Sequence, residues 1–254
     1  MKKLVMMMAL AVSMAVNAAE KNDSTIVDFG DDDDSGSVLK AKKTPFDMDL
    51  SKEDEDGWTT HSLSTHIGVG FTAPTNVPSG MSFATFRSWE LQWTIVQYDY
   101  RPKNKWQTYS IGIGLNWRNY VLKTDKAFYK GGNGEIGLTD WNPQYSDKHS
   151  NIHVASISVP ILFTQKFDKE GHFKLSLGPV VNFNTSADIT NRYSMGDDDV
   201  KVSTNHIGQR PVTIDFMGIF RVYGVGLYCK YSPNSVLKSG RGPQFRSLSF
   251  GLYF

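Results

Sequence analysis

Histidine and serine side chains near the middle of the chain are best suited to nucleophilic chemistry. His149, Ser150 and His153 lie close together, and His206 follows further along the chain. A histidine that takes the proton of a serine hydroxyl activates it for hydrolysis or acyl transfer. No nucleophile motif surrounds this serine, and the region lacks the helical pattern that histidines four residues apart need to bind a metal. We therefore expect no catalytic residue, no metal site and no cofactor.

A second group of charged side chains is embedded in apolar segments. Its members are His66, Glu90, Arg118, Asp215, Arg221 and Lys230. In an enclosed interior such charges must pair, because an unpaired buried charge is costly. The favoured hypothesis is a network of salt bridges that plugs the interior. The alternative is a gate, in which Glu90 or Asp215 exchanges cationic partners and opens a pore.

The composition excludes several classes of protein. One cysteine excludes a disulfide framework and a CxxC-type zinc or redox site. A balance of 27 basic and 26 acidic side chains argues against a nucleic-acid partner. The mean hydropathy of −0.35 excludes a bundle of membrane-spanning helices. None of these excluded classes would account for the high aromatic content of 15 Phe, 11 Tyr and 6 Trp residues.

Residues 1–19 are predicted to be a secretory signal peptide. Lys2 and Lys3 precede an apolar run from Leu4 to Val16, and small residues follow at Ala18 and Ala19. The run is shorter than the roughly 20 residues of a membrane-spanning helix. The sequence therefore predicts export.

From residue 58 onward, apolar and polar residues alternate with a period of two. In one segment, for example, Tyr109, Ile111 and Ile113 alternate with Ser110 and Gly112. This period is typical of β-strands with one apolar face. The eight segments that show it are approximately 60–72, 84–98, 106–121, 152–166, 172–185, 211–222, 224–232 and 245–254.

The character of the two faces predicts the class of all-β fold. The polar face is mostly Gly, Ser, Thr and Asn, which suits a narrow closed interior better than a water-facing surface. The apolar face is rich in Trp, Leu, Ile, Val and Phe, which suits lipid. Residues 58–254 are therefore predicted to form an eight-stranded, antiparallel, up-and-down transmembrane β-barrel. Pro160 and Pro179 fall inside predicted strands, where we expect bulges or interrupted ladders.

The connections between the predicted strands alternate between long and short. Short turns are expected at 101–104, 168–171 and 223–224, and long loops elsewhere. Outer-membrane barrels have short periplasmic turns and longer outer loops, so both termini are expected in the periplasm. Three arginines near the outer rim are expected to contact lipopolysaccharide phosphates. They are Arg87, Arg241 and Arg246.

Residues 20–57 are predicted to be an acidic, disordered periplasmic segment. Residues 20–56 hold 13 acidic and 5 basic side chains and few apolar ones. The run Asp31–Asp34 lacks the alternating ligands and the distal Glu of a calcium loop. One hypothesis makes this segment a linker, and another makes it a binding site for a periplasmic protein.

The last strand is similar to the C-terminal insertion signal of outer-membrane barrels, with Leu248, Phe250, Leu252 and Phe254 at alternate positions. Three further stretches resemble the PorT-type family of small outer-membrane barrels of Bacteroidota. They are Val159–Phe163, Leu177–Val181, and Asp215–Gly218 followed by Gly224–Gly226. The resemblance implies an eight-stranded outer-membrane barrel in a family whose members differ in role, some supporting protein secretion. It brings no catalytic residues.

We therefore expect a non-enzymatic outer-membrane protein with a structural or accessory role in the cell envelope, such as support of protein secretion. A small porin-like channel gated by the salt-bridge network is the alternative, and a lipid-modifying enzyme is a weaker one. The expected partners are outer-membrane lipids, lipopolysaccharide and the barrel-assembly machinery.

Overall fold

The computed structural model describes residues 61–102, 106–123, 125–196 and 198–254, and these form an all-β structure. The predicted signal peptide (1–19) and acidic segment (20–57) lie outside the described residues. Apart from the short 3-10 helix η1 (Thr85–Arg87), the described elements are all strands. None of the described residues belongs to a helix long and apolar enough to cross a membrane.

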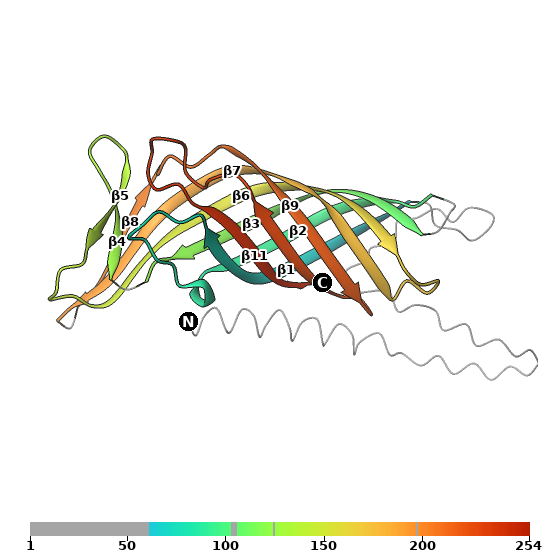
Figure 1. The fold of residues 1–254 in the computed structure, drawn as a ribbon, viewed down its shortest axis with the longest axis horizontal. Helices are drawn as coiled ribbons and strands as arrows, with labels where there is room; N and C mark the ends of the chain where they lie inside the picture. Colours follow the sequence, from blue (N-terminus) through green and yellow to red (C-terminus); the bar gives the residue numbers. More distant parts are fainter. Residues whose placement is uncertain (1–60, 103–105, 124, 197) are drawn as a thin grey trace, which may run out of the picture. The chain divides into compact units, whose positions relative to one another are not determined.

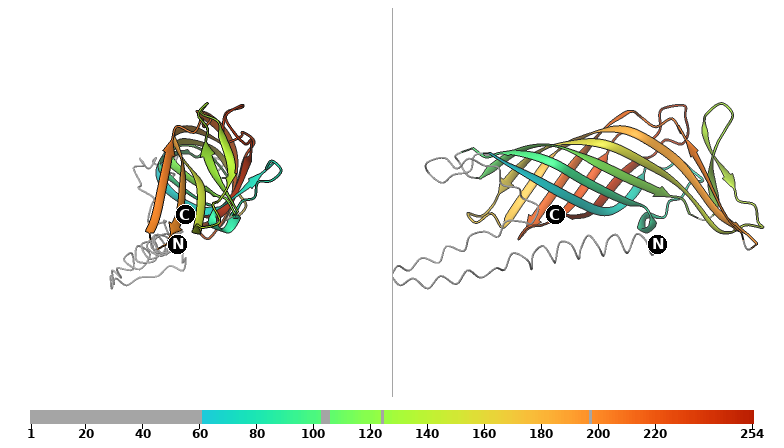
Figure 2. Two further views of the ribbon diagram at one scale, coloured as in Figure 1. Left: turned by 90° about the vertical axis from the view of Figure 1, so that its left-hand side faces the viewer. Right: turned by 180° about the vertical axis from the view of Figure 1, so that it is seen from behind.

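Eight strands pair antiparallel with their neighbours in chain order. They are β1 (His61–Thr75), β2 (Trp89–Tyr100), β3 (Gln107–Val121), β6 (Ser146–Lys166), β7 (Phe173–Met195), β9 (Val212–Val222), β10 (Val225–Ser232) and β11 (Arg246–Tyr253). Because β11 also pairs with β1, and β6 with β7, the sequence of neighbours runs around a ring (Figures 1 and 2). The prediction of an all-β, antiparallel chain is confirmed, and each predicted segment overlaps one of these strands.

Three further strands lie where the sequence predicts loops. β4 (Lys126–Lys130) and β5 (Ile136–Asp140) form a separate hairpin, and β8 (Asp198–Asn205) adds a ninth strand beside the distal part of β7. The residues of β8 are mostly exposed on both faces, so this strand carries no alternating apolar signal. These strands lie at the end of the ring that carries the long connections, which we call the loop end (Figure 1).

A bulge in β2 changes which residues face the interior. Thr94 pairs with Gly114 but Val96 pairs with Ile113, so Ile95 is an extra residue in the ladder. Ile95 and Val96 are both exposed as a result, and the alternation shifts by one position. Asp99 therefore becomes buried, although strict alternation from Glu90 would place it on the outer face.

The two prolines lie beside gaps in the strand pairing. The β3–β6 register has no partner pairs between Ile111–Ile161 and Gly114–Ser158, which is where Pro160 lies. The β6–β7 register likewise skips the positions of Gly178 and Pro179. A proline donates no backbone hydrogen bond, so the ladders are interrupted where the donor is missing.

The outward face of the ring is apolar. Its exposed charged residues are Asp147, Arg192 and Arg246, all at the loop end. The exposed apolar side chains include Trp93, Val96, Tyr109, Ile111, Ile113, Ile161, Leu177, Phe183, Ile214, Phe216, Phe220, Leu227, Phe250 and Leu252. Polar groups are instead concentrated inside, the reverse of the usual arrangement in water.

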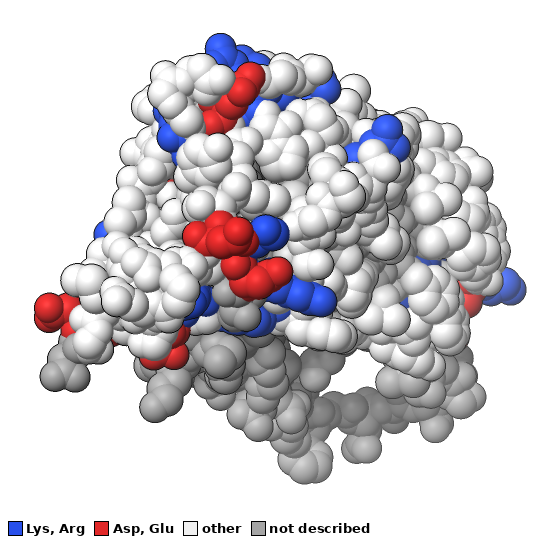
Figure 3. All heavy atoms as spheres, turned by 60° about the vertical axis from the view of Figure 1, so that its left-hand side comes forward, with Lys and Arg blue, Asp and Glu red and all other residues white. Residues whose placement is uncertain are grey.

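At the loop end, apolar side chains fill the interior. Strands β3 and β6 contribute Tyr120 and Ile152, and connecting segments contribute Met81, Leu237 and Phe245. The hairpin of β4 and β5 adds Phe128 and Ile136. We call this group, with the other buried members Leu122, Val154, Ala187, Ile189 and Ile207, the apolar cap. Figure 3 views this end, where charged side chains are scattered between wide uncharged areas.

Truncating Phe245 tests the apolar cap. This side chain is 0% exposed and its ring lies 4.9 Å from that of Phe83 and 5.3 Å from that of Tyr120. Phe245→Ala should lower the free energy of unfolding by about 3–5 kcal/mol, because it leaves a cavity. Phe86→Ala, at a side chain 83% exposed, should change it by less than about 0.5 kcal/mol. Urea unfolding of the full chain measures both, and equal effects would contradict a packed cap.

Candidate functional site

Four charged side chains meet in the interior of the ring. The Arg118 Nε atom on β3 lies 2.9 Å from Glu90 Oε1 on β2, and the same guanidinium pairs with Asp215 on β9. The Lys230 Nζ atom on β10 lies 2.5 Å from Glu90 Oε1. All four residues are buried, and we call them the central network. Two carboxylates face two cations, so the network is neutral.

The strand order explains why these residues converge. Glu90 and Arg118 are direct cross-strand partners on neighbouring strands with inward-facing side chains. Asp215 and Lys230 belong to β9 and β10, which are not neighbours of β2 or β3 in the sheet. Their ion pairs with Arg118 and Glu90 therefore reach across the interior and connect opposite walls of the ring.

Neutral side chains complete the central network. Asn116 Nδ2 donates to Glu90 Oε1 at 3.0 Å, and the Tyr228 hydroxyl donates to Glu90 Oε2 at 3.3 Å. Asn182 Nδ2 donates to Asp215 Oδ2 at 2.8 Å, and Lys230 Nζ donates to Gln92 Oε1 at 3.2 Å. These partners are not among the predicted site residues, although they fall on the same alternate positions as the inward-facing charges. Buried ion pairs need such hydrogen bonds to offset desolvation.

His66 and Arg221, the other two members of the predicted charge network, lie elsewhere. Both contact Tyr253: the His66 ring centroid lies 5.3 Å from its ring, and the Arg221 guanidinium carbon lies 5.1 Å from its centroid. The His66 side chain also meets the Phe254 carbonyl at 3.2 Å. The alternation along a strand shows that a side chain faces inward, but it does not show where the side chain lies along the axis of the ring. The six predicted residues are therefore divided into two groups in the structure.

The serine and histidines do not form a nucleophile–base pair in the described structure. The Ser150 hydroxyl is buried, donates to Asn191 Oδ1 at 2.6 Å and accepts from the Phe128 backbone N–H at 2.9 Å. His149 contacts Arg87 Nη2 at 2.5 Å and lines a loop-end cavity of about 220 Å³. The His153 Nε2 atom lies 2.6 Å from Asn151 Nδ2, and His206 has a positive φ of 56°.

The predicted rim arginines lie at the loop end on three separate segments. Arg87 belongs to η1, Arg241 donates to the Asn133 carbonyl at 3.2 Å, and Arg246 donates to the Tyr231 hydroxyl at 3.4 Å. Three residues of the predicted insertion signal lie within β11, and the fourth, Phe254, directly follows it. Phe250 and Leu252 are exposed, Leu248 is half-buried, and the Phe254 backbone pairs with that of Ile67.

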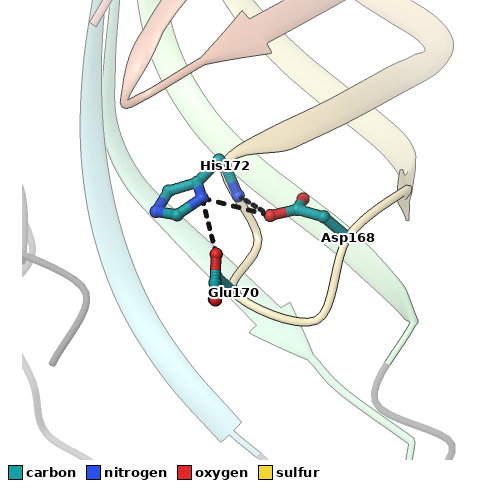
Figure 4. Close-up of side chains that lie close together, drawn as sticks. All are labelled: Asp168, Glu170 and His172. Atoms are coloured by element: carbon teal, nitrogen blue, oxygen red, sulfur yellow. Dashed lines mark hydrogen bonds and ion pairs between the residues drawn. The ribbon is translucent and has the colours of Figure 1, made fainter. Parts of the chain in front are cut away.

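The β6–β7 turn groups three side chains that could hold a metal ion. The His172 Nδ1 atom lies 3.3 Å from Asp168 Oδ2 and 3.1 Å from Glu170 Oε2 (Figure 4). Both Asp168 oxygens already accept backbone N–H groups, from His172 and Phe173 at 2.8 Å each. The carboxylate thus closes the turn, and its interactions are explained without an ion.

Comparison with protein-family models and with curated proteins finds no match for this chain.

Removing Glu90 should destabilise the ring strongly. Glu90→Ala leaves Arg118 without one of its two carboxylates and Lys230 without its ion-pair partner, which should cost about 3–5 kcal/mol of unfolding free energy. Glu135→Ala, at an exposed site on the loop end, should cost less than about 0.5 kcal/mol. Chemical unfolding of the full chain measures both values.

A charge-balanced variant separates unpaired charge from lost volume. Glu90→Leu combined with Lys230→Met removes one charge of each sign and leaves the Arg118–Asp215 pair in place. This double variant should recover part of the stability that Glu90→Ala loses. If the double variant were as unstable as Glu90→Ala, unpaired charge would not be the cause.

The Asp168 turn should weaken in acid. Desolvation opposes the charged carboxylate, but the N–H groups of Phe173 and His172 outweigh it and lower the pKa of Asp168. A lowered pKa stabilises the fold above the ordinary aspartate value of about 3.9, and this contribution disappears as the pH falls through the folded-state pKa. Amide exchange at His172 and Phe173 should therefore accelerate in acid, beyond its intrinsic pH dependence. In Asp168→Asn it should already be fast at neutral pH, whereas Glu170→Gln should resemble the unmodified chain.

Proposed function

We propose that residues 58–254 form an eight-stranded β-barrel that spans the outer membrane and has a non-enzymatic, structural or accessory role in the cell envelope. The observation that supports this proposal most strongly is that the outward face is apolar, whereas polar side chains are concentrated in the interior. The outward face of the ring is apolar on all eight strands, and its exposed charges are confined to the loop end. In water such a surface would be a large aggregation hazard, whereas hydrocarbon chains solvate it well.

Strand length and aromatic placement support the same proposal. A tilted membrane-spanning strand needs about 9–11 residues, and β2 and β9 have 12 and 11. Large aromatic side chains are exposed near the end that carries the short turns, which we call the turn end, where they suit a membrane–water interface. They are Tyr98, Tyr100, Trp106, Phe167 and Tyr223.

The two ends of the ring suggest an orientation. The start of β1 and the end of β11 lie at the turn end, where Ile67 and Phe254 exchange backbone hydrogen bonds. Short turns face the periplasm in outer-membrane barrels, so the loop end, with Arg87, Arg241 and Arg246, would face the lipopolysaccharide leaflet. In this orientation a periplasmic partner would meet the turn end.

The filled interior favours a structural or accessory role over a channel. A permeant would have to pass both the apolar cap and the central network, and both are built from buried side chains. The lipid-modifying alternative draws no support from Ser150, whose hydroxyl contacts an asparagine and a backbone amide. The resemblance to PorT-type barrels makes support of protein secretion the accessory role to test first.

A charge on the outer face tests the membrane proposal. Phe216 is 59% exposed near the middle of β9. Phe216→Lys should reduce the free energy of folding into lipid vesicles by about 2–4 kcal/mol, the cost of a lysine near the bilayer midplane. Phe216→Leu keeps the position apolar and should have a much smaller effect. The folded fraction is measured as protection from protease after refolding of the full chain.

Two results would contradict the proposal. One is a full chain that folds as a soluble monomer without lipid or detergent. The other is equal folding of the lysine and leucine variants in vesicles, which would mean that position 216 does not face hydrocarbon.

A further inference from the structure

A small cavity at the turn end of the ring has a strongly basic wall. Its volume is about 60 Å³, and strands β2, β3, β6, β7 and β9 contribute to its lining. Four cationic side chains line it: Arg101, Lys166, Lys174 and Arg221. Of the described residues that line the cavity, one, Asp99, is acidic. The wall therefore carries a net charge of about +3 at neutral pH.

The strand register places three of these cations side by side. Lys166 is the direct cross-strand partner of Lys174, and Lys174 is the direct partner of Arg221 on the following strand. At the next inward positions the side chains are neutral, and Thr164 and Ser176 share a hydrogen bond of 2.7 Å. We call Lys166, Lys174 and Arg221 the cationic row.

The carboxylate in the wall is already engaged with neutral donors. Asp99 accepts hydrogen bonds from Ser110 at 2.5 Å, from Gln97 at 2.9 Å and from Ser64 at 3.2 Å. In the β6–β7 turn, the Asp168 carboxylate binds backbone N–H groups and His172.

We propose that this cavity binds an oxyanion of the phosphate class, held by the cationic row and Arg101. Lysine and arginine side chains suit phosphate oxygens, and low-dielectric walls of one sign concentrate the opposite charge. The volume is far below the roughly 300–1,000 Å³ of pockets for drug-sized ligands, so a small anion or a single headgroup fits better than a sugar or nucleotide. The inference rests on the interior wall alone and does not need the outer face to contact lipid.

The source of the phosphate is either a free ion or a lipid headgroup. The test uses the full chain in dodecyl maltoside, a detergent without phosphate, at low ionic strength because salt screens exposed charges. Inorganic phosphate is titrated by isothermal calorimetry in one arm. Glycerophosphoglycerol, the water-soluble headgroup of phosphatidylglycerol, is titrated in the other. Saturable binding of inorganic phosphate identifies a free anion as the ligand. Tighter binding of glycerophosphoglycerol identifies a lipid headgroup. Either result supports the site.

Substitution of the cationic row should weaken binding, whereas a matched substitution elsewhere should not. Lys174→Gln combined with Arg221→Gln should weaken binding at least tenfold. Circular dichroism in phosphate-free buffer should show the same β-sheet signal for this variant and for the unmodified chain, so that weaker binding reports the site and not unfolding. Lys126→Gln combined with Lys130→Gln, in β4 at the loop end, removes the same charge and should leave binding unchanged.

Three results would overturn the proposal. The first is no saturable binding of either compound at low ionic strength. The second is equal weakening by the β4 control and the cationic-row variant, which would indicate general attraction to a basic protein. The third is a loss of folding in the cationic-row variant without phosphate, which would make these cations structural.

Discussion

The pairing of β6 with β7 is the interaction on which the rest of the structure depends. These are the longest strands, of 21 and 23 residues, and their register runs from Ser146–Ser194 to Lys166–Lys174. Without this ladder both strands would have an unpaired edge, and exposed edges promote aggregation. With it, every strand of the ring has a neighbour on each side. Backbone polar groups can then be satisfied within the sheet, and this permits an outward face that is largely apolar.

Closure of the sheet also creates a narrow interior that the chain must fill. Small residues make room at close approaches: a Cβ atom at Gly70 would lie 2.6 Å from the Tyr228 hydroxyl, which donates to Glu90. The filling changes along the axis from the apolar cap through the neutral central network to the basic cavity. Each layer carries a different energetic cost, because apolar side chains need only packing, whereas charges need partners.

The sequence predicts the eight strands of the ring and the inward direction of Glu90, Arg118, Asp215 and Lys230, because one period of two governs both. The bulge at Ile95 was missed although the sequence carries a signal for it, because Ile95 and Val96 are adjacent apolar residues and the apolar positions change from odd to even numbers after them. The apolar cap was also out of reach, because Met81 and Leu237 come from segments without periodicity and meet Phe245 only in three dimensions. The cationic row was not predicted either. Lys166, Lys174 and Arg221 are neighbours only because of the register between three strands, and this register is set by the pairing of the whole strands.

The order of the layers weighs against a gate in the central network. If Glu90 released Lys230, a buried charge would lose its ion pair, at a cost of several kcal/mol. That exchange would still open no continuous path, because the apolar cap lies in series with the network and contains no charged group that could respond. Opening the cap would require moving Phe128, Phe245 and Tyr120 out of close packing together. Since two barriers would have to yield at once, the central network is better explained as a cross-link that holds opposite walls of the ring together.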